Sequence, residues 1–374
     1  MRMLVPFGTR PEIVKLAPVV RALRADGIDV TVVATGQHYD AEMTDVFYDE
    51  LGVRPDWVGQ LQGTAAERLG AMLTDALELI TVFRPDLVLV LGDTHTVPCF
   101  CLAARSARIP LAHLEAGLRS FNETSIEEVN RRIAAATASL HLAPTELAAR
   151  FLRAEGIPTE RVRVVGNPVL DVLRELGVAA CPPDERSGVV LTAHRATNVD
   201  DPARLEQLVR LAQDLARKAG PVTFPLHPRT KTRLQAAGML DRLQVDGLEL
   251  CPPVAYRDMV VRVARSRVVV TDSGGLQEEA AWFGVPVVVL RRSTPRWEGI
   301  AAGTSVLTGM DAERALAATL EFVTSDTQAR VAAVPCPYGD GHTAGRVAAL
   351  LKDPASRPLL RLEEPDYVDK APPT

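Results

Sequence analysis

The sequence lacks a segment long and apolar enough to cross a membrane: no uninterrupted apolar run among its 374 residues approaches a bilayer span. It also lacks a basic start followed by an apolar stretch and a small-residue cleavage site, which is the pattern of a signal peptide. Instead, the apolar residues 3–7 lead directly into Gly-Thr-Arg-Pro. We therefore expect a cytoplasmic protein with no signal peptide and no membrane partner.

Positive charge is not in excess. The chain has 42 Lys and Arg against 47 Asp and Glu, a net charge of −5. Proteins that hold nucleic acid by bulk charge are strongly basic, so we expect no nucleic-acid partner. A local basic pocket for a phosphorylated ligand remains compatible with this balance.

Cysteine is scarce and irregularly spaced. The five residues are Cys99, Cys101, Cys181, Cys251 and Cys336. The odd number and uneven spacing do not match a disulfide framework, and the first two fall in a predicted buried helix. We interpret all five as reduced thiols, and nothing supports a cysteine nucleophile.

Short β-branched apolar runs alternate with longer stretches that carry apolar residues at helical spacing, such as 12–25 and 65–83. Near-continuous apolar strands predict parallel sheets covered on both faces. The predicted strands are residues 3–7, 30–34, 87–91, 111–114 and 163–165, then a second set at 189–192, 222–226, 248–251, 268–271 and 286–290. A chain of this length therefore predicts an α/β fold of two Rossmann-like, doubly wound domains, with the ligand in a central cleft. We interpret the turn-rich polar stretch 181–188 as a linker.

The segment TDSGGLQEEA, residues 271–280, follows a predicted strand and opens a predicted helix. Gly274 and Gly275 would let a ligand approach the backbone, while the Ser273 hydroxyl and exposed N–H groups can hold phosphate oxygens. Glu279, about one turn inside the helix, can accept two ribose hydroxyls. The alternative is a helix N-cap with a tight turn. Its position in the second domain and the paired glutamates favour a nucleotide site.

The segment FGTRPE, residues 7–12, forms a second strand-to-helix turn. Pro11 suits the first turn of a helix. Arg10 and Lys15 would add positive charge beside an anion. An ordinary helix start with solvated charges is the alternative for this turn.

Several acids follow predicted strands, where α/β enzymes place catalytic groups. They are Asp93, Glu115 and, at the start of a helix, Glu127. Arg131 lies four residues after Glu127, on the same helix face, so a surface ion pair is the alternative there. His95 and His113 each stand two residues from an acid, but no further cluster completes a ligand set, and we expect no metal.

Two histidines fall where strands of the second domain end: His194 in TAHR and His227 in LHPR. A lone histidine at such a place is more often structural. Two of them at adjacent strand ends of a predicted cleft favour a role in binding or catalysis.

Taken in order, these segments resemble the non-hydrolysing UDP-N-acetylglucosamine 2-epimerase family. The likeness covers about the whole chain, and agreement in order is more specific than any one motif. The matching segments are FGTRPEIVKLAP, LGDTHT, HLEAGLRSFN, EEVNRR, LAPTE, GNPVLD, TAHR, PLHP, TDSGGLQEEA, AGT and PYGDG. The resemblance implies a GT-B-like fold in which residues 1–168 and 342–374 form one domain and 169–341 the UDP-binding one. The last helix would return to the first domain.

The resemblance also implies a chemistry: removal of the C2 proton with loss of UDP, a glycal intermediate, and re-addition of UDP with a proton on the other face. The family's acids match Asp93, Glu115 and Glu127, and its catalytic histidine matches His194. The residues expected to bind the substrate are Arg10, Lys15, Arg131, His227, Ser273, Gly274, Gly275, Glu279 and Arg296. We expect no cofactor, a UDP-sugar as substrate, and a homodimer, as in the family.

The chain also departs from the family's pattern in four places. Residues 124–126 read Thr-Ser-Ile, where a proline commonly precedes the acid pair, and 196–198 read Ala-Thr-Asn, where members activated by a second UDP-sugar have an arginine and a glutamate. Val254 and Met259 replace a polar residue and an aromatic near the expected uracil pocket, and 291–297 carry extra arginines. These changes would fit an unusual sugar.

Four functions therefore stay open at the level of sequence. The first is reversible epimerisation of UDP-GlcNAc to UDP-ManNAc. The second is a hydrolysing enzyme or one that acts on a modified sugar such as a diacetamido uronate. The third is a GT-B glycosyltransferase, which has no need of carboxylates on both faces of C2. The fourth is an inactive sugar-nucleotide binding protein, against which the retained acids argue.

Overall fold

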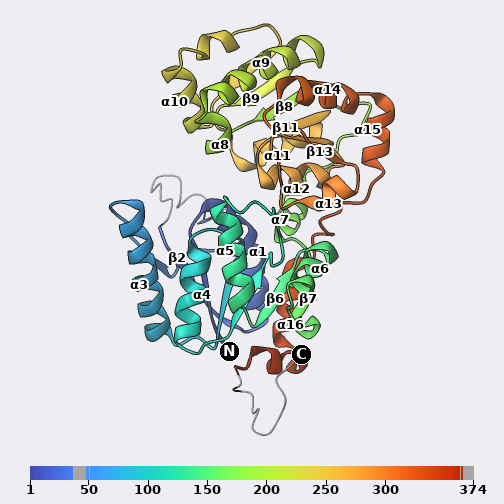
Figure 1. Ribbon diagram of the computed structural model, residues 1–374. Coiled ribbons are helices and arrows are strands. Elements are labelled where there is room, and N and C mark those ends of the chain that lie inside the picture. The colour runs from blue at the N-terminus through green and yellow to red at the C-terminus, as the bar shows by residue number, and fades with distance from the viewer. Residues whose placement is uncertain (37–47, 50, 363, 365–374) are drawn as a thin grey trace. The chain divides into compact units, whose positions relative to one another are not determined.

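Figure 1 shows the computed structural model, which describes residues 1–36, 48–49, 51–362 and 364. The chain divides into two compact units. Unit 1 contains the described residues of Met1–Gly117, Thr124–Val165 and Ala344–Thr374, and unit 2 contains Leu118–Glu123 and Gly166–Thr343. Each unit is built on one parallel sheet with helices on both of its faces, which confirms the predicted α/β class.

The described part of unit 1 forms a parallel sheet of seven strands in the order β3-β2-β1-β4-β5-β6-β7. Its strands β4 and β5 are short and wholly buried, because both faces of the sheet are covered by helices. The strands are β1 (Arg2–Phe7), β2 (Asp29–Ala34), β3 (Trp57–Val58), β4 (Leu87–Leu91), β5 (Leu111–Leu114), β6 (Leu140–Ala143) and β7 (Val162–Val164).

The helices of unit 1 bury apolar stripes against this sheet. Three of them, α3, α4 and α5, lie side by side on one face, where Ile80, Phe100 and Ala134 share a core with Val88 and Val90 of β4 (Figure 1). The helices are α1 (Arg10–Ala25), α3 (Ala65–Phe83), α4 (Thr96–Ser106), α5 (Ile126–Thr137), α6 (Glu146–Ala154) and, from the end of the chain, α16 (Thr343–Lys352). Short 3-10 turns lie at Thr159–Arg161 and Pro354–Leu360.

The sheet of unit 2 repeats the same plan with the strand order β10-β9-β8-β11-β12-β13, all parallel. Successive side chains of a strand point to opposite faces of the sheet, so each face has its own hydrophobic core. Val268 and Val270 of β11 belong to one core, and Val269 belongs to the other. The strands are β8 (Val189–Thr192), β9 (Val222–Pro225), β10 (Leu248–Cys251), β11 (Val268–Thr271), β12 (Val287–Val289) and β13 (Ser305–Leu307).

Helices cover both faces of this second sheet. Leucines of α9 and α14 pack on one face, and apolar residues of α7, α11 and α12 pack on the other. The helices are α7 (Pro168–Leu176), α8 (Ala196–Val199), α9 (Pro202–Lys218), α10 (Pro228–Ala236), α11 (Tyr256–Arg265), α12 (Gly274–Trp282), α13 (Trp297–Ala301), α14 (Ala312–Phe322) and α15 (Ser325–Ala332). A 3-10 turn lies at Leu240–Leu243.

Three strands lie outside the sequence prediction: β3, β6 and β13. They have two, four and three residues, too few for a periodic pattern, and β6 carries the polar His141. The linker interpretation of residues 181–188 is wrong, because this stretch connects α7 to β8 inside unit 2. Its Arg186 is buried and donates to the carbonyls of Phe283 and Gly284, both at 2.7 Å.

Both sheets reverse their strand order at one place, between β1 and β4 in unit 1 and between β8 and β11 in unit 2. In open α/β sheets the helices that follow the two strands leave on opposite faces at such a place, and ligands bind at the carboxyl ends of the strands there. The segments at these two places are FGTRPE and LGDTHT in unit 1, and TAHR and TDSGG in unit 2. The fold therefore brings the predicted motifs to the positions where α/β proteins bind ligands.

Candidate active site

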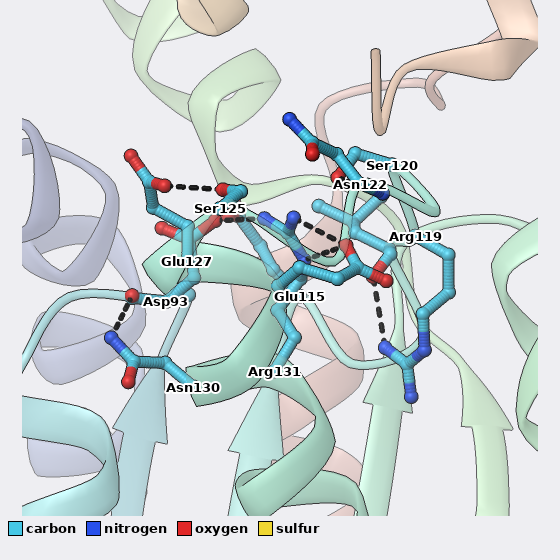
Figure 2. Close-up of polar contacts among 12 residues, drawn as sticks. Asp93, Glu115, Arg119, Ser120, Asn122, Ser125, Glu127, Asn130 and Arg131 are labelled. Atoms are coloured by element: carbon cyan, nitrogen blue, oxygen red, sulfur yellow. Dashed lines mark hydrogen bonds and ion pairs between the residues drawn. The ribbon is translucent and has the colours of Figure 1, made fainter. Parts of the chain in front are cut away.

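In unit 1 the predicted acids follow adjacent strands. Asp93 comes just after β4, Glu115 just after β5, and Glu127 in the first turn of α5. Because β4 and β5 are parallel neighbours, their carboxyl ends meet at one edge, and Figure 2 shows these acids close together there. Glu115 has a φ of 62°, a left-handed conformation that is rare for a residue with a side chain and tends to occur at functional sites.

Glu115 is held by a buried cation. The Nζ atom of Lys15 lies 2.5 Å from Glu115 Oε1, and both side chains are nearly inaccessible to solvent. Lys15 comes from α1, so the lysine predicted to bind an anion of the ligand contacts one of the predicted acids. A buried ion pair costs desolvation on both sides, which makes it weak evidence for stability and favours a role in the site.

Arg131 lies at the centre of the other polar contacts (Figure 2). Its side chain is 3% exposed, so the alternative of a surface ion pair is wrong. It pairs with the Asp93 carboxylate and lies 2.6 Å from Glu128 Oε2. The half-buried Glu127 accepts a hydrogen bond of 2.5 Å from the Ser125 hydroxyl.

The FGTRPE turn begins α1, as predicted, with Pro11 in its first turn. Arg10 is exposed at the first residue of the helix. The turn is more than an ordinary helix start, because the carboxylate of Glu12 is buried and contacts both Thr9 and Thr94.

In unit 2 the two predicted histidines do lie together. The rings of His194, after β8, and His227, after β9, have centroids 5.3 Å apart. Burial and the nearby charge of His194 lower the pKa of His227. Its Nδ1 accepts a hydrogen bond of 3.2 Å from Arg229 N, which requires the neutral ring and caps α10.

His194 is held by Asp272, a residue to which the sequence analysis assigns no role. The carboxylate lies 3.1 Å from His194 Nδ1 and also accepts backbone hydrogen bonds from His194 and Arg195. Asp272 is fully buried. Burial raises the pKa of this carboxyl, but hydrogen bonds from His194 and Arg195 outweigh it and hold the pKa below its usual value. Because Nδ1 faces Asp272, the other ring nitrogen, Nε2, is the one presented to a ligand.

The SGG turn at the start of α12 forms a candidate phosphate site. Ser273 occupies the N-cap position, yet among the described residues its side chain makes no capping hydrogen bond. The guanidinium of Arg296 lies against Gly274, where an added Cβ would come within 3.3 Å of its Cζ and Nη1 atoms. Helix N–H groups, a hydroxyl and a guanidinium therefore converge, which is the donor set that binds phosphate.

The carboxylate of Glu279 lies next to this turn. It accepts a hydrogen bond of 3.1 Å from the Tyr256 hydroxyl. Burial and the neighbouring Glu279 raise the pKa of Tyr256, so the tyrosine remains a donor. This contact fixes Glu279 for an acceptor role toward hydroxyl groups.

Other kinds of site find no support in the described part of the chain. No group of three or more His, Cys, Asp or Glu there could hold a metal ion. His113 is buried in β5, with its Nε2 atom 2.8 Å from the Gly92 carbonyl oxygen. None of the helices described is both long and apolar enough to cross a bilayer.

Comparison with known proteins decides the family. Residues 21–352 match the family model described as UDP-N-acetylglucosamine 2-epimerase. The chain is 35% identical over 368 residues to the UDP-N-acetylglucosamine 2-epimerase of Methanocaldococcus jannaschii, covering 94% of this chain and 99% of that one. The protein belongs to the UDP-N-acetylglucosamine 2-epimerase family.

A crystal structure of the same M. jannaschii enzyme and one further relative bear on the site. The crystal structure of the M. jannaschii enzyme in complex with UDP-GlcNAc and UDP superposes with a TM-score of 0.84 and 34% identity, over 94% of this chain and 99% of that one. The UDP-2,3-diacetamido-2,3-dideoxy-D-glucuronate 2-epimerase of Pseudomonas aeruginosa is 34% identical, over 94% of this chain and 99% of that one. Members of the family are thus named for more than one UDP-sugar, and their fold is the predicted GT-B-like fold.

Among the residues without a role in the sequence analysis of this epimerase family member, Asp272 contacts the predicted site residue His194, and Glu12 contacts Thr94, the neighbour of Asp93. Tyr256 and Glu278 do the same for Glu279 and Arg296. The signal for Asp272 and Glu278 was their place inside TDSGGLQEEA, a motif already singled out. Their partners come from other strands, so the contacts follow only from the fold.

Proposed function

We propose that this protein catalyses the reversible epimerisation of UDP-N-acetylglucosamine to UDP-N-acetylmannosamine at C2, as a non-hydrolysing enzyme. Family membership supports the reaction class, and the relative crystallised with UDP-GlcNAc supports the substrate. The observation that carries the proposal is the group of acids at the carboxyl edge of the unit 1 sheet: Asp93, Glu115 and Glu127. Arg131 pairs with Asp93, and Lys15 pairs with Glu115.

The proposed reaction needs a base and an acid at C2. A carboxylate takes the C2 proton, the electron pair forms a C1–C2 double bond, and the C1–O bond breaks to release UDP. In the reverse step UDP adds to C1 and an acid returns a proton to the other face of C2. We propose that Asp93, Glu115 and Glu127 supply these groups, a role that suits positioned carboxyls.

The departing diphosphate needs positive charge and hydrogen-bond donors. In unit 2 the N-terminus of α12, with Ser273 and Gly275, and the guanidinium of Arg296 supply both. We propose His194 as a further catalytic group and Glu279 as the acceptor for ribose hydroxyls. From unit 1, we propose Arg10 as an additional cation for the diphosphate.

A second candidate substrate is a charged relative of the same sugar. One 34% identical relative is named for UDP-2,3-diacetamido-2,3-dideoxy-D-glucuronate. In this chain, Arg291 and Arg292 follow β12 directly, and Arg292 is exposed. An arginine here would suit a carboxylate on the sugar.

Turnover in deuterated buffer is expected to separate these possibilities. With UDP-GlcNAc, NMR should show UDP-ManNAc and solvent deuterium at C2 in both sugars, because the proton is removed and replaced. Free ManNAc would indicate hydrolysis, and turnover of the diacetamido glucuronate alone would indicate the second substrate. Transfer of the sugar without deuterium at C2 would contradict the epimerase proposal and favour a glycosyltransferase.

We also propose a homodimer that forms through the α3–α4–α5 face of unit 1. Apolar side chains on the outer side of these neighbouring helices are exposed, and large exposed apolar faces tend to be interfaces. These side chains are Leu69, Leu77, Val82, Leu102 and Val129.

Replacement of Leu102 by glutamate is expected to convert the dimer to a monomer, because a charge would be buried in the interface. Leu102 is 49% exposed, so the folded monomer should tolerate the change. Val164→Glu is the matched control. Val164 is 44% exposed, but it lies on β7, an edge strand of the unit 1 sheet, and not on α3, α4 or α5. Light scattering should give the monomer mass for Leu102→Glu only. A dimer that persists in Leu102→Glu, or a monomeric wild type, would contradict the proposal.

A further inference from the structure

The strand order of unit 1 reverses between β1 and β4, which continue into α1 and α4. The two strands pair near their amino ends, Met3 with Leu87 and Leu4 with Val88. Past their carboxyl ends, α1 carries Lys15 and the turn before α4 carries Asp93, both of the proposed site. A contact between the turns before α1 and α4 would therefore set the positions of both.

Glu12 makes such a contact. Its Oε2 atom accepts hydrogen bonds from Gly8 N at 2.9 Å, Thr9 N at 2.8 Å and the Thr9 hydroxyl at 3.0 Å. Its Oε1 atom accepts a hydrogen bond of 2.8 Å from the hydroxyl of Thr94. One carboxylate thus joins the turn after β1 to the turn after β4.

The chain contains the same capping motif elsewhere for comparison. At the start of α3, Glu67 Oε2 accepts from Thr64 N at 2.7 Å and from the Thr64 hydroxyl at 2.8 Å. Glu67 is exposed, and hydrogen bonds from Thr64 lower its pKa. Glu12 is buried instead, and burial raises its pKa to about 7 despite hydrogen bonds from Gly8 and Thr94. Capping a helix does not require this unfavourable burial, so the link to Thr94 needs a separate reason.

The reason lies in the residue beside Thr94. Asp93 is held from the α5 side. Its main-chain oxygen accepts a hydrogen bond of 2.9 Å from Asn130 Nδ2, and its carboxylate pairs with Arg131 (Figure 2). Glu12 holds the same turn from the α1 side. Three residues later on α1, Lys15 pairs with Glu115. The first turns of α1 therefore reach the turns of two proposed catalytic acids.

We infer that Glu12 is a positioning residue: its carboxylate joins the turn after β1 to the turn after β4 and holds Asp93 where the proposed reaction uses it. The inference rests on the proposed epimerase function. Glu12 acts through Thr94 and does not contact the substrate.

The test removes the hydrogen bond between Thr94 and Glu12 and leaves the cap of α1 intact. Thr94→Val removes the hydroxyl that donates to Glu12, and Thr94→Ser retains a hydroxyl. For Thr94→Val, kcat for epimerisation is expected to fall roughly 10- to 100-fold while KM changes by less than about twofold, because a small displacement affects the reacting geometry more than binding. Thr94→Ser should restore most of the rate. Glu67→Ala, which removes the other capping box, should lower thermal stability and leave kcat unchanged.

A wild-type kcat in Thr94→Val, or equal effects on kcat and KM, would overturn the inference. A second measurement does not depend on activity: amide hydrogen exchange of residues 8–12 and 92–95 should quicken in Thr94→Val and not in Glu67→Ala. If the wild type turns over neither UDP-sugar, the proposed function fails. Amide hydrogen exchange then tests separately whether Glu12 joins the two turns. Unchanged exchange at both turns in Thr94→Val would overturn that contact's structural role.

Discussion

Replacement of Glu115 by glutamine is expected to lower the rate of C2 epimerisation roughly 10²- to 10⁴-fold, the range typical of a lost acid or base. Glutamine keeps the size of the side chain and cannot take up or release the proton. UDP affinity should stay within about threefold, because, apart from Arg10, the proposed phosphate and ribose contacts lie in unit 2 at Ser273, Arg296 and Glu279. Steady-state kinetics and calorimetric titration with UDP measure the two quantities.

The contact with Lys15 requires a stability control. Glu115→Gln leaves a buried ammonium without its anion at 2.5 Å, and breaking a buried pair costs about 3–5 kcal/mol. Thermal unfolding must therefore show a folded protein at the assay temperature. Ser273→Ala is the opposite variant, expected to weaken UDP binding. If Glu115→Gln loses UDP affinity as much as Ser273→Ala does, the assignment of acids to C2 and of unit 2 to the nucleotide is wrong.

The sequence predicted the architecture well because the signals are local. Strands such as β4 and β11 are continuous apolar runs, and those patterns fix both the strand and its burial on two faces. The position of TDSGG after β11 and before α12 is local in the same way. Strands of two or three residues at a sheet edge, β3 and β13, carry too little pattern, and the boundary between units falls where no composition change marks it.

For the candidate site residues, the sequence predicted their places after strands and only some of their partners. Asp93, Glu115 and His194 each follow a strand, as expected. Spacing along one helix suggested Glu127 as the partner of Arg131, and the structure gives Arg131 the partners Glu128 and Asp93. An i,i+4 spacing places two side chains on one helix face but does not require them to pair. Which carboxylate pairs with the guanidinium depends on what α5 packs against.

A buried acid makes a similar contact at the strand-order reversal of each unit. In unit 1 an acid on α1, Glu12, reaches the turn after β4; in unit 2 an acid after β11, Asp272, reaches the turn after β8. Each acid is buried and accepts a hydrogen bond across the point where the strand order reverses: Glu12 from the Thr94 hydroxyl, and Asp272 from the main-chain N–H groups of His194 and Arg195. Parallel strands give no hairpin to fix their neighbouring turns, so a buried carboxylate between the turns supplies the missing constraint.

Replacement of Asp272 by asparagine is expected to lower kcat roughly 10²- to 10⁴-fold, by analogy with the carboxylate that orients the histidine of a catalytic triad. Asp272 lies 3.1 Å from His194 Nδ1 and so selects the nitrogen that faces the ligand. An amide NH₂ would point two hydrogens at a group of donors, among them the N–H groups of His194 and Arg195 and the amide of Asn198. Stability should therefore fall as well, by about 1–3 kcal/mol for a buried polar group left unsatisfied.

The dependence on pH and a matched variant separate these two effects. Because the pKa of Asp272 is lower in the folded protein than in the unfolded chain, its stabilisation is present above the unfolded pKa and is lost as pH falls through the folded value. The stability difference between the wild type and Asp272→Asn should thus shrink below about pH 4. Asp171→Asn is the control, since Asp171 is also buried in unit 2 and accepts a backbone hydrogen bond of 3.0 Å, from Thr343. Asp171→Asn should reduce stability and leave kcat near the wild-type value. An equal loss of kcat in both variants would mean that Asp272 stabilises the fold and does not orient His194.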